Sequence, residues 1–209
     1  MIATKTNAKP KIVGPRQLGQ RMSLKAFEFV RVEEGYIAEL SRGYVVVSEV
    51  ANTPHALRFS LLRSYLGVYH IEHLDMVRAV LNSNECKLLI PDWESERHPD
   101  IAVYLTAPRG KKGRTQWRTW VPELVIEVVS ESSRDRDYSM KRDEYWTLGV
   151  KEYWIVDAQL RQVLVLKRGR SQWTEKPLGT DDVCETKLLP GFKLPCRAIF
   201  DAAGDEEKG

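Results

Sequence analysis

Apolar and polar residues follow each other along the chain with a period that changes several times. Ser23 precedes apolar residues at Leu24, Phe27 and Val30, a spacing that predicts a short amphipathic helix with Ser23 as its N-cap. The period then becomes two, and YIAEL and YVVVSEV on either side of SRG predict a β-hairpin. The segment HALRFSLLRSYLG returns to helical spacing and predicts a helix that ends at Gly67.

The remaining pattern predicts strands interleaved with one further helix. VRAVL, CKLLI and PDIAVYL predict extended segments, and LVIEVV predicts a strand buried on both faces because this run is short, β-branched and bounded by Pro and Ser. DRDYSMKRDEYWTLG predicts a helix capped near Asp135 or Asp137 and ended by Gly149. KEYWIVD, RQVLVLKR and QWTEKPL predict more strands before the closing segment LLPGFKLPCRAIF. Because strands and helices are intermixed, we expect a mixed β-sheet with helices packed on it.

Composition places this pattern in an ordinary globular protein. The 209 residues are 43% hydrophobic and 29% charged, which suits one domain with short extensions. Residues 1–22 carry basic residues without an acid and predict a flexible basic arm, for which a DNA-binding arm is the alternative. We expect a single domain over residues 23–201 and an acidic tail over 202–209. No apolar run has the length of a membrane span and the N-terminus lacks the apolar core of a signal peptide, so we expect a cytoplasmic protein.

One acid stands where the pattern predicts an apolar interior. Glu127 lies in the middle of LVIEVV, and strand alternation puts it on the same face as Val125 and Val129. An ionised carboxylate in an apolar interior is costly unless it is paired, hydrogen-bonded or bound to a metal. The structural alternative is a pair with an arginine such as Arg134.

A second acid and a lysine suggest what Glu127 does. Asp100 stands at the start of the preceding apolar strand, and if the two strands are neighbours, the two carboxylates converge and repel each other. A divalent cation removes that repulsion, and hard oxygen ligands suit Mg²⁺ or Mn²⁺. Lys141 follows on the next helix, where it can orient or activate a water. Metal, paired carboxylates and an ammonium group together make a site that hydrolyses phosphodiesters.

This order of residues resembles the PD-(D/E)XK nuclease superfamily: a PD pair, an acid inside an apolar strand, and a lysine. More closely, PDIAVY, PELVIEVVSESSRDRDYSMKRDEYWTLGVKEYWIVD and LLPGFKL resemble the Uma family of bacterial proteins described as putative restriction endonucleases. The resemblance extends from about Phe27 to Phe200. It implies an α/β fold with a restriction-endonuclease-like mixed β-sheet core flanked by helices, an additional β-hairpin and C-terminal strands.

The resemblance also implies roles for individual residues. It carries over Asp100 and Glu127 as catalytic acids and metal ligands. The commonest superfamily pattern has its lysine two residues after the strand acid, where this chain has Val129; the Uma family presents a lysine from the following helix, and Lys141 matches it. Glu39 in AELSRG matches a further acid in an early strand and is expected as an additional metal ligand, although Arg42 replaces the usual Asp of that turn.

Several other polar residues have structural explanations. His55 follows Thr53 and Pro54 at a predicted helix start, where polar side chains are commonly structural, with a role in the site as the alternative. Ser130 and Ser132 have no histidine near them in sequence, so they suit a loop better than a nucleophile.

The loop from Thr106 to Trp120, between the two strands that carry the acids, is basic and aromatic. Its basic residues would bind phosphates, and Trp117 and Trp120 would stack on exposed bases. A surface loop that does not contact the substrate is the alternative. The basic residues of this loop are Arg109, Lys111, Lys112, Arg114 and Arg118.

Together these features predict a Mg²⁺- or Mn²⁺-dependent endonuclease that hydrolyses DNA. Asp100 and Glu127 would hold the metal and Lys141 would assist the attacking water. The alternative is a nuclease fold that has lost activity and serves as a nucleic-acid-binding or regulatory module. We expect a homodimer or higher homo-oligomer, because members of the superfamily often dimerise to cut both strands.

Overall fold

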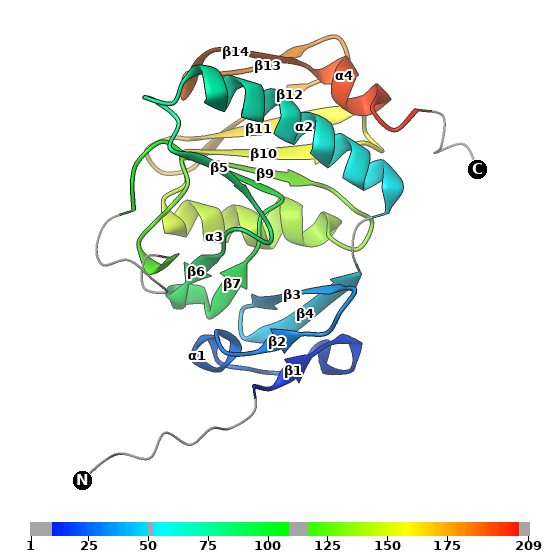
Figure 1. The fold of residues 1–209 in the computed structure, drawn as a ribbon, viewed down its shortest axis with the longest axis vertical. Coiled ribbons are helices and arrows are strands. Elements are labelled where there is room, and N and C mark those ends of the chain that lie inside the picture. The colour runs from blue at the N-terminus through cyan, green and yellow to red at the C-terminus, as the bar shows by residue number, and fades with distance from the viewer. Residues whose placement is uncertain (1–9, 50–51, 109–116, 205–209) are drawn as a thin grey trace. The chain divides into compact units, whose positions relative to one another are not determined.

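A computed structural model describes residues 10–49, 52–108 and 117–204 of the chain (Figure 1). The chain divides into two compact units, and each is described by itself. Unit 1 consists of Met1–Val50 with Pro91–Arg97, and unit 2 consists of Ala51–Ile90 with His98–Gly209. The sequence predicted one domain over residues 23–201; within that range the structure distinguishes these two units.

Unit 1 begins with residues that the sequence assigned to a flexible arm. Strand β1 (Ile12–Val13) pairs in parallel with β2 (Arg31–Val32), and a 3₁₀ turn (Pro15–Gln17) follows β1. Val13 and Met22 are buried, so apolar burial orders this segment although its charge pattern is that of a tail. Helix α1 (Leu24–Phe27) then begins at Ser23, whose hydroxyl accepts the N–H of Ala26, as the sequence predicted.

The sheet of unit 1 is built on the predicted hairpin. Strands β3 (Tyr36–Ser41) and β4 (Tyr44–Glu49) pair antiparallel, and β7 (Ser95–Arg97), which follows a 3₁₀ turn at Pro91–Trp93, pairs with the other edge of β3. The two turn residues, Arg42 and Gly43, both have positive φ, as a two-residue hairpin turn requires. Glycine adopts this conformation without strain, whereas Arg42 does so at some cost.

Unit 2 contains the large sheet. Its six strands lie in the order β12–β11–β10–β9–β8–β5. The neighbours β9 and β10 are parallel, and the other neighbouring pairs are antiparallel. The strands span β5 (Ala79–Asn82), β8 (Ile101–Tyr104), β9 (Leu124–Val128), β10 (Glu152–Asp157), β11 (Gln162–Arg168) and β12 (Trp173–Leu178). This mixed sheet confirms the predicted α/β class.

Helices cover both faces of this sheet (Figure 1). One face packs against α2 (Thr53–Glu72), α4 (Cys196–Asp201) and the hairpin of β13 (Val183–Thr186) with β14 (Leu189–Pro195). The other face packs against α3 (Lys141–Leu148) and the short strand β6 (Leu88–Ile90). All five residues of β9 are buried, as the apolar run predicted, because layers lie on both sides of it.

Helix α2 differs from its prediction at Gly67. The sequence predicted an end there, but the helix continues to Glu72. Leu66 and Tyr69 continue the apolar face and are buried in the core, which offsets the cost of about 1 kcal/mol for glycine inside a helix. Within the described ranges, no helix combines the length and the hydropathy needed to cross a membrane.

Candidate active site

Glu127 is buried between the sheet and α3. Its strand β9 alternates, so that Leu124, Ile126 and Val128 face α2 while Val125 and Glu127 face α3. The Glu127 side chain is only 4% exposed. Its Oε1 accepts the hydroxyl of Tyr145 at 2.6 Å and lies 3.1 Å from Lys141 Nζ. Two residues of α3 therefore hold one oxygen of this carboxylate.

Asp100 lies beside Glu127 on the neighbouring strand. The antiparallel register of β8 and β9 pairs Ile101 with Ile126, which makes Asp100 and Glu127 the next facing positions. The N–H of Asp100 donates to Glu127 Oε2 at 3.4 Å, and Asp100 Oδ2 accepts the N–H of Val128 at 2.8 Å. The sequence analysis made the approach of the two acids conditional on these strands being neighbours, and β8 and β9 do pair.

Lys141 reaches Glu127 from the first turn of α3. Its ammonium lies between two buried carboxylates, 3.1 Å from Glu127 Oε1 and 2.9 Å from Asp137 Oδ1. The side chain is 7% exposed, so both ion pairs are shielded from water. Val129, where the common superfamily pattern has its lysine, packs instead against the apolar cluster on the same face.

His55 also joins the site, from the first turn of α2. Its Nε2 donates to the carbonyl oxygen of Val128 at 2.9 Å and lies 3.5 Å from Asp100 Oδ2. Burial alone would lower the pKa of His55, but the hydrogen bond and negative charge of Asp100, with contributions from Val128 and Glu127, outweigh burial and raise this pKa. His55 therefore lies next to Asp100, and its role in the site stays a prediction.

These groups fit a hard divalent cation. Asp100 and Glu127 supply carboxylate oxygens on adjacent strands, and carboxylates outnumber ammonium groups in the cluster. Within residues 10–49, 52–108 and 117–204, no three side chains of His, Cys, Asp or Glu form a ligand set for a metal. A cation here would accordingly have two carboxylates, with water completing its shell, which is the pattern that Mg²⁺ commonly adopts.

Glu39 has a close partner within unit 1. Arg97 Nη1 donates to Glu39 Oε2 at 3.1 Å, and Arg97 Nη2 donates to Ser41 at 2.8 Å. Both Glu39 and Arg97 are buried. This pair gives Glu39 a structural role in the unit 1 sheet, and its role as a metal ligand stays a prediction.

Arg134, expected as a possible structural partner of Glu127, pairs with another acid. Its guanidinium donates instead to both oxygens of Asp157, at 2.5 and 2.9 Å. Ser130, in the loop after β9, hydrogen-bonds through its hydroxyl to Ser132 and Ser133. That local network suits a loop, as expected, and not an activated nucleophile.

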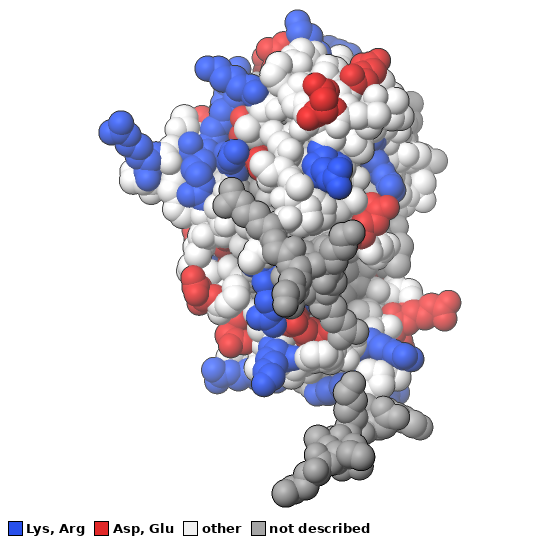
Figure 2. Space-filling model, turned by 60° about the vertical axis from the view of Figure 1, so that its left-hand side comes forward, with Lys and Arg blue, Asp and Glu red and all other residues white. Residues whose placement is uncertain are grey.

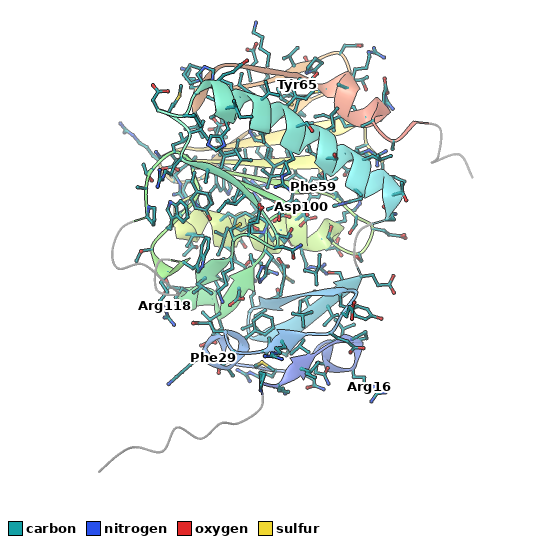
Figure 3. All side chains as sticks on the ribbon, in the orientation of Figure 1. Arg16, Phe29, Phe59, Tyr65, Asp100 and Arg118 are labelled. Carbon is teal, nitrogen blue, oxygen red and sulfur yellow. The ribbon has the colours of Figure 1, made fainter. Side chains whose placement is uncertain are left out.

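The described ends of the basic loop lie at the ends of β8 and β9 that point away from the acids. Strand β8 runs away from Asp100 into the loop, and β9 returns from it toward Glu127, so the described ends of the loop lie at the opposite ends of these strands. Figure 3 shows Asp100 and Arg118 well separated. Trp120 is buried against Tyr104, and Trp117 stacks on Trp120. The predicted phosphate contacts Arg109, Lys111, Lys112 and Arg114 lie outside the described residues.

A second basic surface lies in unit 2, on the sheet face opposite Glu127. Figure 2 shows Lys and Arg side chains gathering on one flank of the molecule. A groove of about 600 Å³ between the β11–β12 and β13–β14 hairpins has Val165, Leu178 and Phe192 in its lining. Its four lysines are Lys167, Lys176, Lys187 and Lys193. Because the sheet separates this groove from α3, it is not part of the site around Glu127.

Two residues of the site, Asp137 and Tyr145, were not predicted to belong to it, and Asp137 was expected only as a possible helix cap, although the sequence contains a sign of both. Asp137, Lys141 and Tyr145 are spaced four residues apart, which places them along one side of a helix. Asp137 and Tyr145 both contact the predicted residues, Asp137 through Lys141 and Tyr145 through Glu127. The spacing indicates a shared face, but only the packing of α3 on β9 shows that this face points at an acid.

Comparisons with known proteins identify the family and support the fold. Residues 25–197 match the family Uma2, described as "Putative restriction endonuclease". A crystal structure of a putative nuclease belonging to DUF820 from Anabaena variabilis has a similar fold, with a TM-score of 0.71 at 15% sequence identity. The similarity covers 87% of this chain and 99% of that one. No curated protein matches the chain.

Proposed function

The chain belongs to the Uma2 family of putative restriction endonucleases, and we propose that it is a Mg²⁺- or Mn²⁺-dependent endonuclease that hydrolyses phosphodiester bonds of DNA. The observation that carries this proposal is that the carboxylate of Glu127 on β9 meets both the backbone N–H of Asp100, the residue just before β8, and the ammonium of Lys141 on α3. Asp100 and Lys141 are 27 and 14 positions from Glu127 in sequence, yet both contact it in space.

The three residues would divide two tasks between them. Asp100 and Glu127 would bind the cation through their carboxylate oxygens. The ammonium of Lys141, held beside Glu127, would donate a hydrogen bond that orients the attacking water and stabilises negative charge at the phosphate. Tyr145 fixes Glu127 Oε1 by its hydrogen bond, which keeps the carboxylate in one orientation. When bound, the cation would neutralise the scissile phosphate and lower the pKa of a coordinated water.

The basic loop is proposed as a contact to the DNA backbone outside the catalytic centre. Replacing Lys111, Lys112 and Arg114 with Ala should weaken DNA binding and reduce the salt dependence by about one unit of log-log slope for each phosphate that the variant no longer neutralises. Metal affinity should stay the same. If DNA affinity and salt slope are both unchanged, the loop does not touch the substrate.

The second candidate function is nucleic-acid binding without cleavage. The ion pairs of Lys141 with Glu127 and Asp137 favour this candidate only if they persist in the presence of a cation, because Lys141 would then block one metal ligand. A cation that binds Asp100 and Glu127 and loosens the contact of Lys141 with Glu127 is compatible with both candidates. Cleavage itself therefore separates them.

The deciding experiment is a plasmid cleavage assay. Purified protein is incubated with supercoiled DNA and Mg²⁺ or Mn²⁺, with EDTA as the metal-free control and a structured RNA as a second substrate. Asp100→Ala serves as the negative control, and Asp181→Asn, an exposed acid with an 87% accessible side chain, serves as the matched control. Nicking by wild type and Asp181→Asn alone supports the enzyme. Binding without nicking supports the second candidate, and cleavage restricted to RNA would refute DNA as the substrate.

Self-association remains a separate prediction. On β13, Val183 is an exposed apolar residue, whereas α2 and the turn after it present Val68, Ile71 and Leu74 at 58, 74 and 70% exposure. This region is thus a better place to disrupt a dimer than the C-terminal strands. Sedimentation of wild type and of an Ile71→Lys variant would test this, with a monomeric wild type as the result that refutes it.

A further inference from the structure

Asp137 is a buried acid next to the site, and the proposed reaction gives it no role. It lies in a π-helical turn (Arg136–Met140) that leads directly into α3, and its side chain is 1% exposed. A buried carboxylate at such a place is costly unless its partners compensate for lost water. Turns of this kind occur frequently at functional sites.

Its two oxygens have different partners. Oδ2 accepts the hydroxyl of Ser133 at 2.6 Å, and Oδ1 lies 2.9 Å from Lys141 Nζ. The backbone on both sides is fixed as well, because the N–H of Asp137 donates to Ser133 and its carbonyl oxygen accepts the hydroxyl of Tyr153 at 3.0 Å. Asp137 is therefore held rigidly on one side and contacts a flexible side chain on the other.

Lysine is the group that needs such a support. Its four-carbon chain has many rotamers, and holding the ammonium in one place costs up to roughly 2 kcal/mol of conformational entropy. Glu127 alone cannot hold Lys141 during a reaction in which Glu127 also binds a cation. A second anion, fixed from outside the metal-binding pair, keeps the ammonium near the attacking water when its contact with Glu127 loosens.

We propose that Asp137 is a positioning residue that holds Lys141 at the catalytic acid, and that Ser133 and Tyr153 in turn hold Asp137. The proposal rests on the proposed endonuclease function. It deepens that function by explaining how a lysine carried on a helix takes the place of one on the strand: the strand lysine would be fixed by its backbone, whereas the helix lysine is fixed by Asp137.

A double-mutant cycle on cleavage tests whether Asp137 acts through Lys141. Asp137→Asn keeps the side-chain shape and removes the charge, and it should lower kcat by about tenfold or more with the KM for DNA and the Mn²⁺ affinity unchanged. In a Lys141→Met background the same change should have no further effect, because there is no ammonium left to hold. Losses that multiply in the double variant would overturn the proposal. Asp137→Glu, which restores the charge, should recover part of the rate.

Two controls separate positioning from loss of fold. Ser133→Ala removes the hydrogen bond to Oδ2 together with the hydroxyl's bonds to Ser130, and it should lower kcat in the same direction by a smaller factor, again only when Lys141 is present. Asp143→Asn changes an acid on the same helix, two residues from Lys141 and hence on another side, and should leave cleavage unchanged. Melting curves select the variants that remain folded.

A measurement without metal or DNA separates failure of this proposal from failure of the proposed function. A lysine ammonium buried between two carboxylates exchanges its protons slowly, so ¹H–¹⁵N spectra of lysine side chains should show a signal that Lys141→Met removes. Asp137→Asn should broaden or shift this signal and Asp143→Asn should not. If wild type cleaves nothing but the signal behaves so, the endonuclease is refuted while the positioning contact stands. An unchanged signal in Asp137→Asn overturns the positioning itself.

Discussion

Glu127 and Asp157 are buried carboxylates on the same face of neighbouring parallel strands, yet their surroundings differ. Glu127 on β9 pairs in register with Ile155 of β10, and Asp157 stands two residues further along β10. Their side chains are 4% and 1% exposed. Adjacent residues of the π-helical turn contact the surroundings of the two acids. Asp137 forms an ion pair with Lys141, which also contacts Glu127, and the hydroxyl of Tyr138 donates to Asp157.

Both carboxylate oxygens of Asp157 accept hydrogen bonds from neighbouring protein groups. Arg134 donates to both of its oxygens, Tyr138 donates to Oδ2 at 2.9 Å, and the N–H of Leu160 donates to Oδ1 at 3.2 Å. A bidentate arginine matches a carboxylate in charge and shape. Asp157 is thus an acid whose function is structural: it ties the loop after β9 to the end of β10.

Glu127 shares its partners with other groups. Its ammonium partner, Lys141, also contacts Asp137, and its Oε2 faces the backbone N–H of a second acid at 3.4 Å. Replacing the flexible lysine contact by a cation requires little rearrangement, whereas a fork of two hydrogen bonds to arginine resists it. A buried acid that lies near a second acid and shares a lysine is therefore a candidate for chemistry, and one closed by arginine is not.

The largest effect is expected from replacing the two acids of the candidate active site, Asp100 and Glu127. Asp100→Ala or Glu127→Gln should reduce cleavage to background and weaken Mn²⁺ binding, because each removes a carboxylate ligand. The variants should still fold, since each substitution reduces the excess of negative charge among the carboxylates around Lys141. Calorimetry with Mn²⁺ and the plasmid assay measure both effects, and metal affinity equal to wild type in both variants would refute the ligand assignment.

Next comes the lysine that Glu127 shares. Lys141→Met should lower the cleavage rate by roughly a hundredfold or more while metal and DNA binding persist, the size typical of a lost acid-base or electrostatic group. Val129→Lys combined with Lys141→Met should restore part of the rate, because it returns an ammonium to the face of Glu127. Cleavage by Lys141→Met at the wild-type rate would remove Lys141 from the mechanism.

A smaller effect, on stability and not on cleavage, is expected for the ion pair of Asp157 with Arg134. Asp157→Asn should lower the free energy of unfolding by about 2–3 kcal/mol, less than for a fully buried pair because the Arg134 side chain is 31% exposed. This corresponds to roughly 5–10 °C in melting temperature for a protein of this size. Metal affinity per folded molecule should not change. A variant that melts like wild type but loses Mn²⁺ binding would show that Asp157, and not only Glu127, takes part in metal binding.

The smallest effect concerns pH. Burial alone would raise the pKa of Asp157, but the hydrogen bonds of Arg134, Leu160 and Tyr138, with the charge of Arg134, outweigh burial and lower this pKa below its ordinary value of 3.8. The stability from this pair is therefore fully present above that value and is lost as pH falls through the lower folded-state pKa. The difference in unfolding free energy between wild type and Asp157→Asn should shrink in urea titrations below about pH 4. A difference that stays constant down to about pH 2 would contradict this.

Local pattern was sufficient for most of the elements. Ser23 as an N-cap, the turn at Arg42 and Gly43, the buried run of β9 and the helix end at Gly149 depend on residues close in sequence, and all four are confirmed. Prediction failed where distant packing outweighed local preference. Helix α2 passes through Gly67 because Leu66 and Tyr69, on either side of the glycine, are buried in a core formed with strands distant in sequence.

The chemistry available to this protein can be read from its amino acids alone. An acid inside an apolar run, a second acid before the neighbouring run and a lysine on the next helix are statements about composition and period, and the periods fix which side chains share a face. Which charges meet depends on the tertiary structure. Arg134 pairs with Asp157 and not with Glu127, Glu39 pairs with Arg97, and Asp137 pairs with Lys141. These pairings form because the distances between the elements bring those charged groups within reach of each other. Such distances depend on how β9, β10 and α3 pack, and no residue spacing along the chain contains them.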